Sequence, residues 1–210
     1  MAFIIFFINI NKKKAFGIDL SVEQIKICEE KGLNAKAIAL EDVEEKFDCA
    51  TAIFDVLNYI PNQKASQLAF DSGLVAEGKD WCDIHPKTFE SKLVKNVHVI
   101  GDASNAAPMP KSAFSASTQG KVVALQIARM LKQQEPLNPP KLANTCYSLV
   151  SPTYAISIAA VYEAQEDKIV DLKDLGAGGL SPANAEASFR AQEAQYAVAW
   201  YKNQMGDVFL

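Results

Sequence analysis

The sequence is poor in the residues that crosslink small domains or hold metals. Only four cysteines and two histidines occur among 210 residues, and no two cysteines form a CxxC pair. The cysteines are Cys28, Cys49, Cys82 and Cys146. Their wide spacing argues against a disulfide-dense framework and against a structural zinc site. His85 and His98 have no partner at metal-binding spacing, so we read both as structural and expect no bound metal.

Positive charge and long apolar runs are also scarce. The 21 Lys and Arg residues are outnumbered by 25 Asp and Glu residues, so the chain lacks the basic footprint of a protein that binds nucleic acid. The apolar residues 1–10 fall far short of the roughly 20 that a membrane-spanning helix needs. Lysines 12–14 follow this run, whereas an export signal carries its positive charges first. We expect no transmembrane segment, and read residues 1–10 as a buried strand or a misplaced start.

Apolar residues make up 49% of the chain, which is enough to bury a sizeable core. In the first part, apolar stretches at 15–20, 35–39 and 47–59 read as strands, and a helix is expected from Ser21 to Gly32. Strands that alternate with helices indicate an α/β fold with a parallel sheet.

The second part predicts an α+β arrangement. We expect a short strand at 97–100, an amphipathic helix at 114–131, a linker at 136–140, strand character at 147–162, a turn at 176–179 and a terminal helix at 183–203. Together with the two family resemblances described next, these elements lead us to expect three segments, residues 1–54, 55–135 and 136–210.

The N-terminal quarter resembles a class I S-adenosylmethionine-dependent methyltransferase. The resemblance rests on AFGIDLS at 15–21 and FDCATAIFDVLNYI at 47–60. It implies that Asp19 is the ribose-binding acid, but the family's first strand and glycine-rich loop have no counterpart here. The alternative is that Asp19 is a strand-end acid that caps the next helix.

Residues 55–210 resemble a different family, the flavoprotein subunit of flavocytochrome c sulfide dehydrogenase. The matching strings are DVLNYIPNQKA at 55–65, HVIGDAS at 98–104, PMPKSAFSASTQGKVVA at 108–124, NTCYSLVSPTYAISIAAVY at 144–162 and QYAVAWYKNQMGDVF at 195–209. This resemblance implies an incomplete FAD/NAD(P)-binding-type fold with a C-terminal flavin-facing domain. Both resemblances share DVLNYI, which suggests a join between two reading frames at that point.

A glycine and an acid follow the apolar stretch at 97–100, and ligands of open α/β sheets bind where strands end. The resemblance implies that Asp102 binds the ribityl chain of FAD and that Gly101 lets the backbone approach; alternatively, Asp102 caps a turn. Lys111 and Ser112 precede a long helix, whose positive end suits an electron-rich ring. The resemblance places them at the pyrimidine side of the flavin, although Lys111 could simply be solvated.

Cys146 lies in the segment that, by resemblance, presents one half of a redox-active disulfide to the flavin. Sulfide would attack that disulfide and leave a persulfide, and the released thiolate would pass its electrons to FAD. The family's partner cysteine lies in an upstream segment that has no counterpart in this chain, and Cys82 reads as a buried thiol. Trp200 matches a tryptophan that packs beside the flavin, with a core-filling role as the alternative.

The sequence therefore favours an FAD-dependent sulfide dehydrogenase with sulfide as substrate and a cytochrome c subunit as partner, located in the periplasm as the family is. No GxGxxG motif occurs, so we expect FAD binding to be weak or lost. The alternatives are a non-catalytic fragment and a methyltransferase fragment. Catalytic activity, and a quinone in place of cytochrome c as electron acceptor, stay open at this point.

Overall fold

The computed structural model describes residues 5–9, 14–19, 26, 29–30, 35–37, 56–58 and 63–209. The chain divides into two compact units, residues 1–63 and residues 64–210. Each unit is described by itself below, as the N-terminal and the C-terminal unit. The expected segment boundaries at 54/55 and 135/136 stay predictions.

The N-terminal unit contains a four-stranded sheet in the order β3-β2-β1-β4. Its strands are β1 (Ile5–Asn9), β2 (Lys14–Asp19), β3 (Ala35–Ala37) and β4 (Val56–Asn58). The expected parallel pairing is found between β2 and β3, whereas β1 is antiparallel to both of its neighbours. Residues 10–13 explain the difference, because so short a connection cannot make the crossover that parallel neighbours require. Asp19 ends β2, as expected from the sequence.

Helical residues 26, 29 and 30 agree with the helix predicted after Ser21. Ser21 and Gly32, its expected ends, lie outside the described residues, as do Cys28, Cys49 and most of the expected strand at 47–59. The methyltransferase resemblance of the first quarter of the chain and the role of Asp19 therefore stay predictions.

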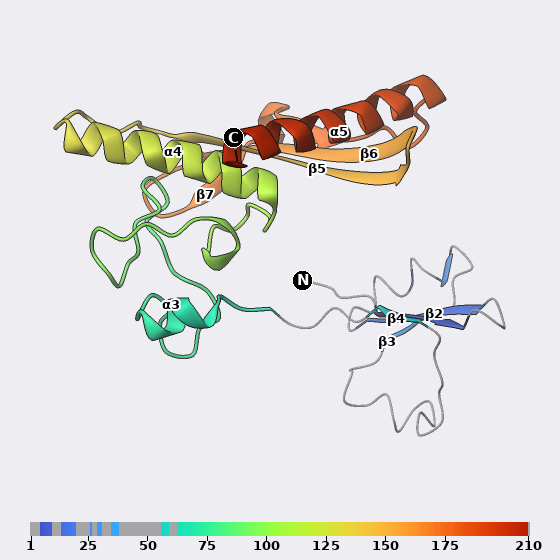
Figure 1. The fold of residues 1–210 in the computed structure, drawn as a ribbon, viewed down its shortest axis with the longest axis horizontal. Coiled ribbons are helices and arrows are strands. Elements are labelled where there is room, and N and C mark those ends of the chain that lie inside the picture. Colours follow the sequence, from blue (N-terminus) through green and yellow to red (C-terminus); the bar gives the residue numbers. More distant parts are fainter. Residues whose placement is uncertain are drawn as a thin grey trace. The chain divides into compact units, whose positions relative to one another are not determined.

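The C-terminal unit is built on a long hairpin, with one long helix before it in the chain and another after it (Figure 1). Its elements are α3 (Gln67–Asp71), η3 (Gly101–Ala103), α4 (Ala113–Leu131), β5 (Lys141–Ser151), β6 (Tyr154–Ala164), β7 (Ile169–Asp171), η4 (Lys173–Leu175), β8 (Gly178–Leu180) and α5 (Ala187–Phe209). Strands β5, β7 and β8 all pair with β6 in antiparallel fashion. Helices on an antiparallel sheet confirm the expected mixed α/β class with an α+β C-terminal part.

The two helices hold opposite faces of the hairpin. Asn144 of β5 accepts hydrogen bonds from the first turn of α4, whereas Ser157 of β6 donates to Glu193 of α5. Ser157 lies opposite Tyr147 in the register, and residues 144 and 147 of one strand point to opposite faces. The edge of β5 that does not pair with β6 lies between the start of α4 and the second half of α5.

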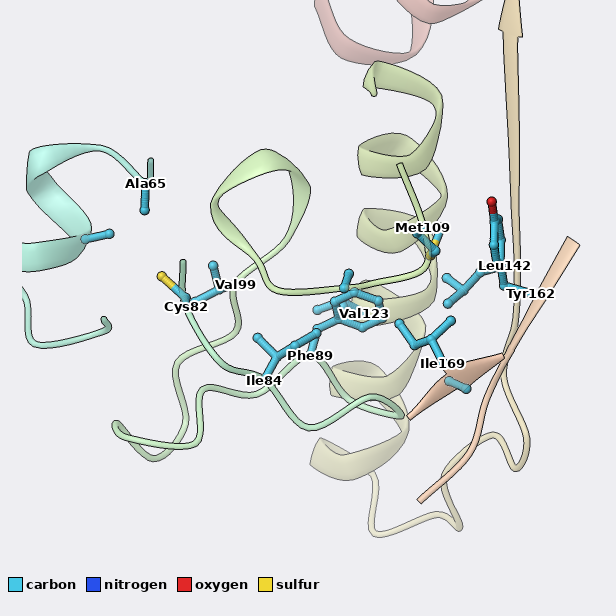
Figure 2. Close-up of a cluster of buried hydrophobic side chains, with 13 residues drawn as sticks. Ala65, Cys82, Ile84, Phe89, Val99, Met109, Val123, Leu142, Tyr162 and Ile169 are labelled. Carbon is cyan, nitrogen blue, oxygen red and sulfur yellow. The ribbon is translucent and has the colours of Figure 1, made fainter. Parts of the chain in front are cut away.

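The core of the C-terminal unit joins α4 to the hairpin and to the irregular segment 81–104. Phe89 is fully buried at its centre and packs in one cluster with Val123 of α4 and Leu142 of β5 (Figure 2). The segment 81–104 is held by single β-bridges, Cys82 to Ser104, Ile84 to Ser91 and Glu90 to His98, in place of a sheet.

Three sequence predictions for this unit need comment. The helix expected at 114–131 is confirmed as α4, and residues 136–140 are irregular as expected. The strand expected at 97–100 is wrong: His98 makes one isolated bridge and the Val99 N–H donates to Phe89, because the neighbouring chain is a loop with no ladder to join. The strand character at 147–162 resolves into two strands that turn at residues 152–153, and the terminal helix begins and ends later than expected.

Candidate functional site

A small polar network surrounds the thiol of Cys146. The side-chain amide of Asn144 places Nδ2 3.2 Å and Oδ1 3.8 Å from the sulfur. Its Oδ1 accepts hydrogen bonds from the hydroxyls of Ser112, at 2.5 Å, and Ser115, at 3.1 Å. Because both hydroxyls face Oδ1, the N–H side of the amide is the side turned to Cys146. Asn144 and Ser115 are buried, so solvent does not compete for these contacts.

The same network fixes the N-terminus of α4. Ser112 is the N-cap residue, and its Oγ accepts from the N–H of Ser115 at 3.1 Å. None of the described hydrogen bonds uses the N–H of Ala113 or of Phe114. Two backbone donors at the positive end of a 19-residue helix are therefore available to a ligand that carries negative charge.

A groove of about 470 Å³ opens along the free edge of β5, next to this helix end. Ser112, Cys146 and Trp200, three of the residues singled out from the sequence, all line it. The rings of Trp200 and Phe114 stack at 5.4 Å between centroids and 14° between planes, which closes the groove on the side of α5. The other lining residues are Ala113, Thr145, Tyr147, Leu149, Ala197, Val198 and Tyr201, so the walls are mostly apolar and aromatic.

Gly101 and Asp102 lie in η3, which contacts α4. Gly101 has φ +67°, and an added Cβ would come within 3.3 Å of Ala116 of α4, so only glycine fits both its backbone and its space. Its N–H donates to Gln119 Oε1 at 2.7 Å and is therefore occupied within the protein. The side chain of Asp102 is exposed, and no described hydrogen bond uses its carboxylate.

Lys111 connects η3 to α4. Its Nζ donates to the carbonyls of Asp102, at 2.5 Å, and Ser104, at 2.9 Å, and lies 3.7 Å from the ring centre of Trp81. Burial lowers the pKa of Lys111, against the opposing effects of Asp102 and Cys82. The side chain that was expected either at a flavin or in solvent is thus engaged in an internal clamp, which holds Asp102 close to the helix end that carries Ser112.

Cys82 contrasts with Cys146. It is fully buried, and both cysteines are free thiols among the described residues. Burial, helped by the nearby Asp83, raises the pKa of Cys82, and Lys111 acts in the opposite direction. Cys82 therefore lies where the sequence placed it, in the core, and Cys146 has no disulfide partner among the residues that the structure describes.

Several residues of the site escaped the sequence analysis. Asn144 could have been found, because it stands two positions before Cys146 and so shares its strand face. Phe114 and Trp81 gave no signal, since their partners Trp200 and Lys111 are brought to them only by the tertiary fold. Gln119 reads as one more polar position of an amphipathic helix until its contact with Gly101 is seen.

Two further observations concern metal ligands and helix hydropathy. Within the described part of the chain, no cluster of three or more His, Cys, Asp or Glu side chains could hold a metal ion, and His98 Nδ1 instead lies 2.8 Å from the Thr88 carbonyl oxygen. In the same part, none of the helices has the length and apolar character needed to cross a bilayer.

The fold thus brings a half-exposed thiol, an open helix end and stacked aromatic rings together beside an antiparallel sheet. A comparison with known families gives the kind of domain that this part of the chain resembles. Residues 138–209 match the family model described as flavocytochrome c sulphide dehydrogenase, flavin-binding. The match confirms the resemblance to the flavoprotein subunit over this part of the chain, and it supports FAD as the cofactor. Asn144, Cys146 and Trp200 fall inside the matched range, and Gly101, Asp102, Lys111 and Ser112 precede it.

Proposed function

We propose that this chain acts in an FAD-dependent sulfide dehydrogenase of the flavocytochrome c type, with Cys146 as the sulfide-reactive residue. The observation that carries the proposal is the groove that brings Cys146, the open N-terminus of α4 and Trp200 together inside a match to a flavin-binding family. The electron acceptor in this proposal is a cytochrome c subunit, and the location is the periplasm.

The residues around the groove suit a flavin. The unused N–H groups of Ala113 and Phe114 can donate to an electron-rich ring, and they favour its reduced, anionic state through the positive helix end. The carboxylate of Asp102 is free to accept a hydrogen bond from a sugar-like hydroxyl. Trp200 supplies a flat apolar surface that excludes water from the thiol.

The proposed chemistry begins with Cys146 in a disulfide with a cysteine of a second polypeptide, because the segment that holds the family's partner cysteine has no counterpart in this chain. A hydrosulfide ion attacks the Cys146 sulfur, a new S–S bond forms there, and the disulfide bond breaks. The partner cysteine leaves as a thiolate with the electron pair, and Cys146 keeps the incoming sulfur as a persulfide. A flavin held by the N–H groups of Ala113 and Phe114 beside Trp200 would supply the acceptor for this electron pair and a path of single electrons to the cytochrome c subunit.

The test is an anaerobic titration with sulfide of the purified chain, mixed with FAD and its cytochrome c partner. The chain is first treated with glutathione disulfide, so that Cys146 carries a mixed disulfide whose glutathione cysteine stands in for the partner cysteine. We expect sulfide-dependent loss of the oxidised flavin absorbance followed by cytochrome c reduction, and complete loss of both in Cys146→Ser. Cys82→Ala is the matched control, since a buried thiol outside the groove should leave the reaction intact. Equal rates in wild type and Cys146→Ser, or a chain that binds no flavin, would rule the proposal out.

A further inference from the structure

We propose that Asn144 is a positioning residue for Cys146: its side-chain amide is locked so that an N–H donor is held against the sulfur and stabilises it as a thiolate. This role goes beyond the function proposed above, in which sulfide attacks Cys146 within a disulfide, because it concerns the reduced site with Cys146 as a free thiol. It is carried by an arrangement of four side chains from β5 and α4, in which Asn144 is the only link between the thiol and the helix end within the described contacts.

The orientation of the amide is determined by its surroundings. Ser112 Oγ already accepts from the N–H of Ser115, so its own proton is free to go to Asn144 Oδ1. Ser115 Oγ donates to the same oxygen. With the amide inverted, its NH₂ group would donate to the two hydroxyl oxygens, but neither hydroxyl proton would have an acceptor among the described hydrogen bonds. The observed orientation gives both hydroxyl protons an acceptor and places Nδ2 3.2 Å from the sulfur.

The position of Asn144 leaves it no freedom to turn away. Its exposed fraction is 3%, and that of Ser115 is 1%, so neither side chain can exchange its partner for water. Cys146 itself is half-buried and lines the groove, where a reagent can reach it. The donor is therefore rigid and shielded while the sulfur remains accessible, which is the arrangement that a reactive thiolate requires.

The proposed role of Asn144 depends on its N–H donor, whereas a purely structural role depends on its shape. A change to aspartate separates the two, because it removes the donor and keeps the shape. Asn144→Asp keeps the shape and both acceptor contacts to the serine hydroxyls, but it removes the N–H donor and puts a carboxylate on the sulfur. Ser148→Asp is the matched control, because residue 148 also stands two positions from Cys146 on the same strand face but is exposed. An exposed charge there is screened by solvent.

The measurement is the alkylation rate of Cys146 with neutral iodoacetamide and with anionic iodoacetate, followed by peptide mass spectrometry. In Asn144→Asp we expect the iodoacetamide rate to fall by about tenfold or more, as for loss of a hydrogen bond to a charged group. The iodoacetate rate should fall further, because the new carboxylate repels an anionic reagent. In Ser148→Asp the iodoacetamide rate should change by less than about threefold. An iodoacetamide rate that stays at the wild-type value in Asn144→Asp, or that changes equally in both variants, overturns the proposal.

A milder variant covers the case in which Asn144→Asp does not fold. Ser115→Ala removes one of the two hydroxyls that lock Oδ1 and leaves the amide in place. We expect alkylation of Cys146 to slow by about twofold to fivefold, the effect of one ordinary hydrogen bond. An unchanged rate overturns the proposal. Alkylation requires neither flavin nor sulfide, so this outcome is independent of the test of the proposed function.

Discussion

The segment around Cys82 and the groove around Cys146 hold the same chemical group in opposite surroundings. Cys82 is sealed in the loop segment 81–104, where burial and Asp83 raise the pKa of its thiol. Cys146 stands at a sheet edge beside an open helix end, with an amide donor on its sulfur. The reactivity of a cysteine follows from its access to solvent and from its neighbouring groups. Packing in the core is enough to explain the presence of Cys82.

The sharpest way to break this contrast is Phe89→Ala, because Phe89 is the fully buried centre of the core that seals Cys82 (Figure 2). Removing the ring leaves a cavity in this core. We expect the free energy of unfolding to fall by about 3–5 kcal/mol in urea titrations.

Phe89→Ala should also raise the alkylation rate of Cys82 far more than that of Cys146, since opening of the loop segment exposes only the former. Equal acceleration of both thiols would mean that the two regions share one barrier to access. A loss of stability below about 1 kcal/mol would show that Phe89 does not hold the core together.

Glu193→Gln tests the helix that closes the groove. The Glu193 carboxylate is buried and accepts from Ser157, Ser181 and Arg190, so α5 is attached to the sheet through one charge. Arg190 is itself buried and keeps one unpartnered nitrogen, Nε, among the described contacts. Loss of the carboxylate leaves this charge unpaired, and we expect unfolding stability to fall by about 2 kcal/mol.

The same residue sets a pH dependence. Burial acts to raise the pKa of Glu193, but the hydrogen bonds from Ser181, Ser157 and Arg190 outweigh it and hold the pKa below the ordinary 4.5. The resulting stability is therefore fully present above 4.5 and is lost as the pH falls through the lower folded value. Acid titration of unfolding should show this loss in wild type and a flatter curve in Glu193→Gln.

An exposed ion pair on the same helix provides the control for Glu193. Asp207 pairs with Lys121 of α4 at 2.7 Å, with both side chains more than half exposed. Asp207→Asn should change stability by less than about 0.5 kcal/mol, because solvent screens such pairs. If both variants behave alike, the buried network does not anchor α5.

A smaller loss than that in Glu193→Gln is expected for Ser112→Ala, which removes the N-cap of α4 and one donor to Asn144. Loss of an N-cap serine costs about 1 kcal/mol of stability. Ser117→Ala, within the same helix, is the control and should be neutral or slightly stabilising, since alanine has the higher helix propensity. Differential scanning calorimetry of the pair would contradict this role if both variants had the same Tm.

The sequence predicted the local elements of the site better than its contacts. The helix at 114–131 follows from amphipathic spacing. Gly101 is singled out through the family resemblance, whereas its positive φ is seen only in the structure. The grouping of Ser112, Cys146 and Trp200 around one groove agrees with the family resemblance, but no local pattern contains it.

Two features could not be predicted from local pattern. The Lys111 clamp depends on Trp81, which is 30 positions away in the sequence and reaches the lysine only through the fold of segment 81–104. The stretch at 97–100 has strand composition, yet it forms no strand because a strand requires a neighbour with which to pair. Long-range pairing decides both outcomes.

The most direct test of a flavin-facing groove measures, in one sample, how FAD changes the alkylation rates of Cys146 and Cys82. Alkylation of Cys146 and Cys82 is followed by mass spectrometry, without and with free FAD at about ten times its Kd. The account predicts that FAD slows alkylation of Cys146 by about tenfold and leaves that of Cys82 unchanged. Bound FAD that protects neither thiol, or that protects Cys82 instead, would contradict it.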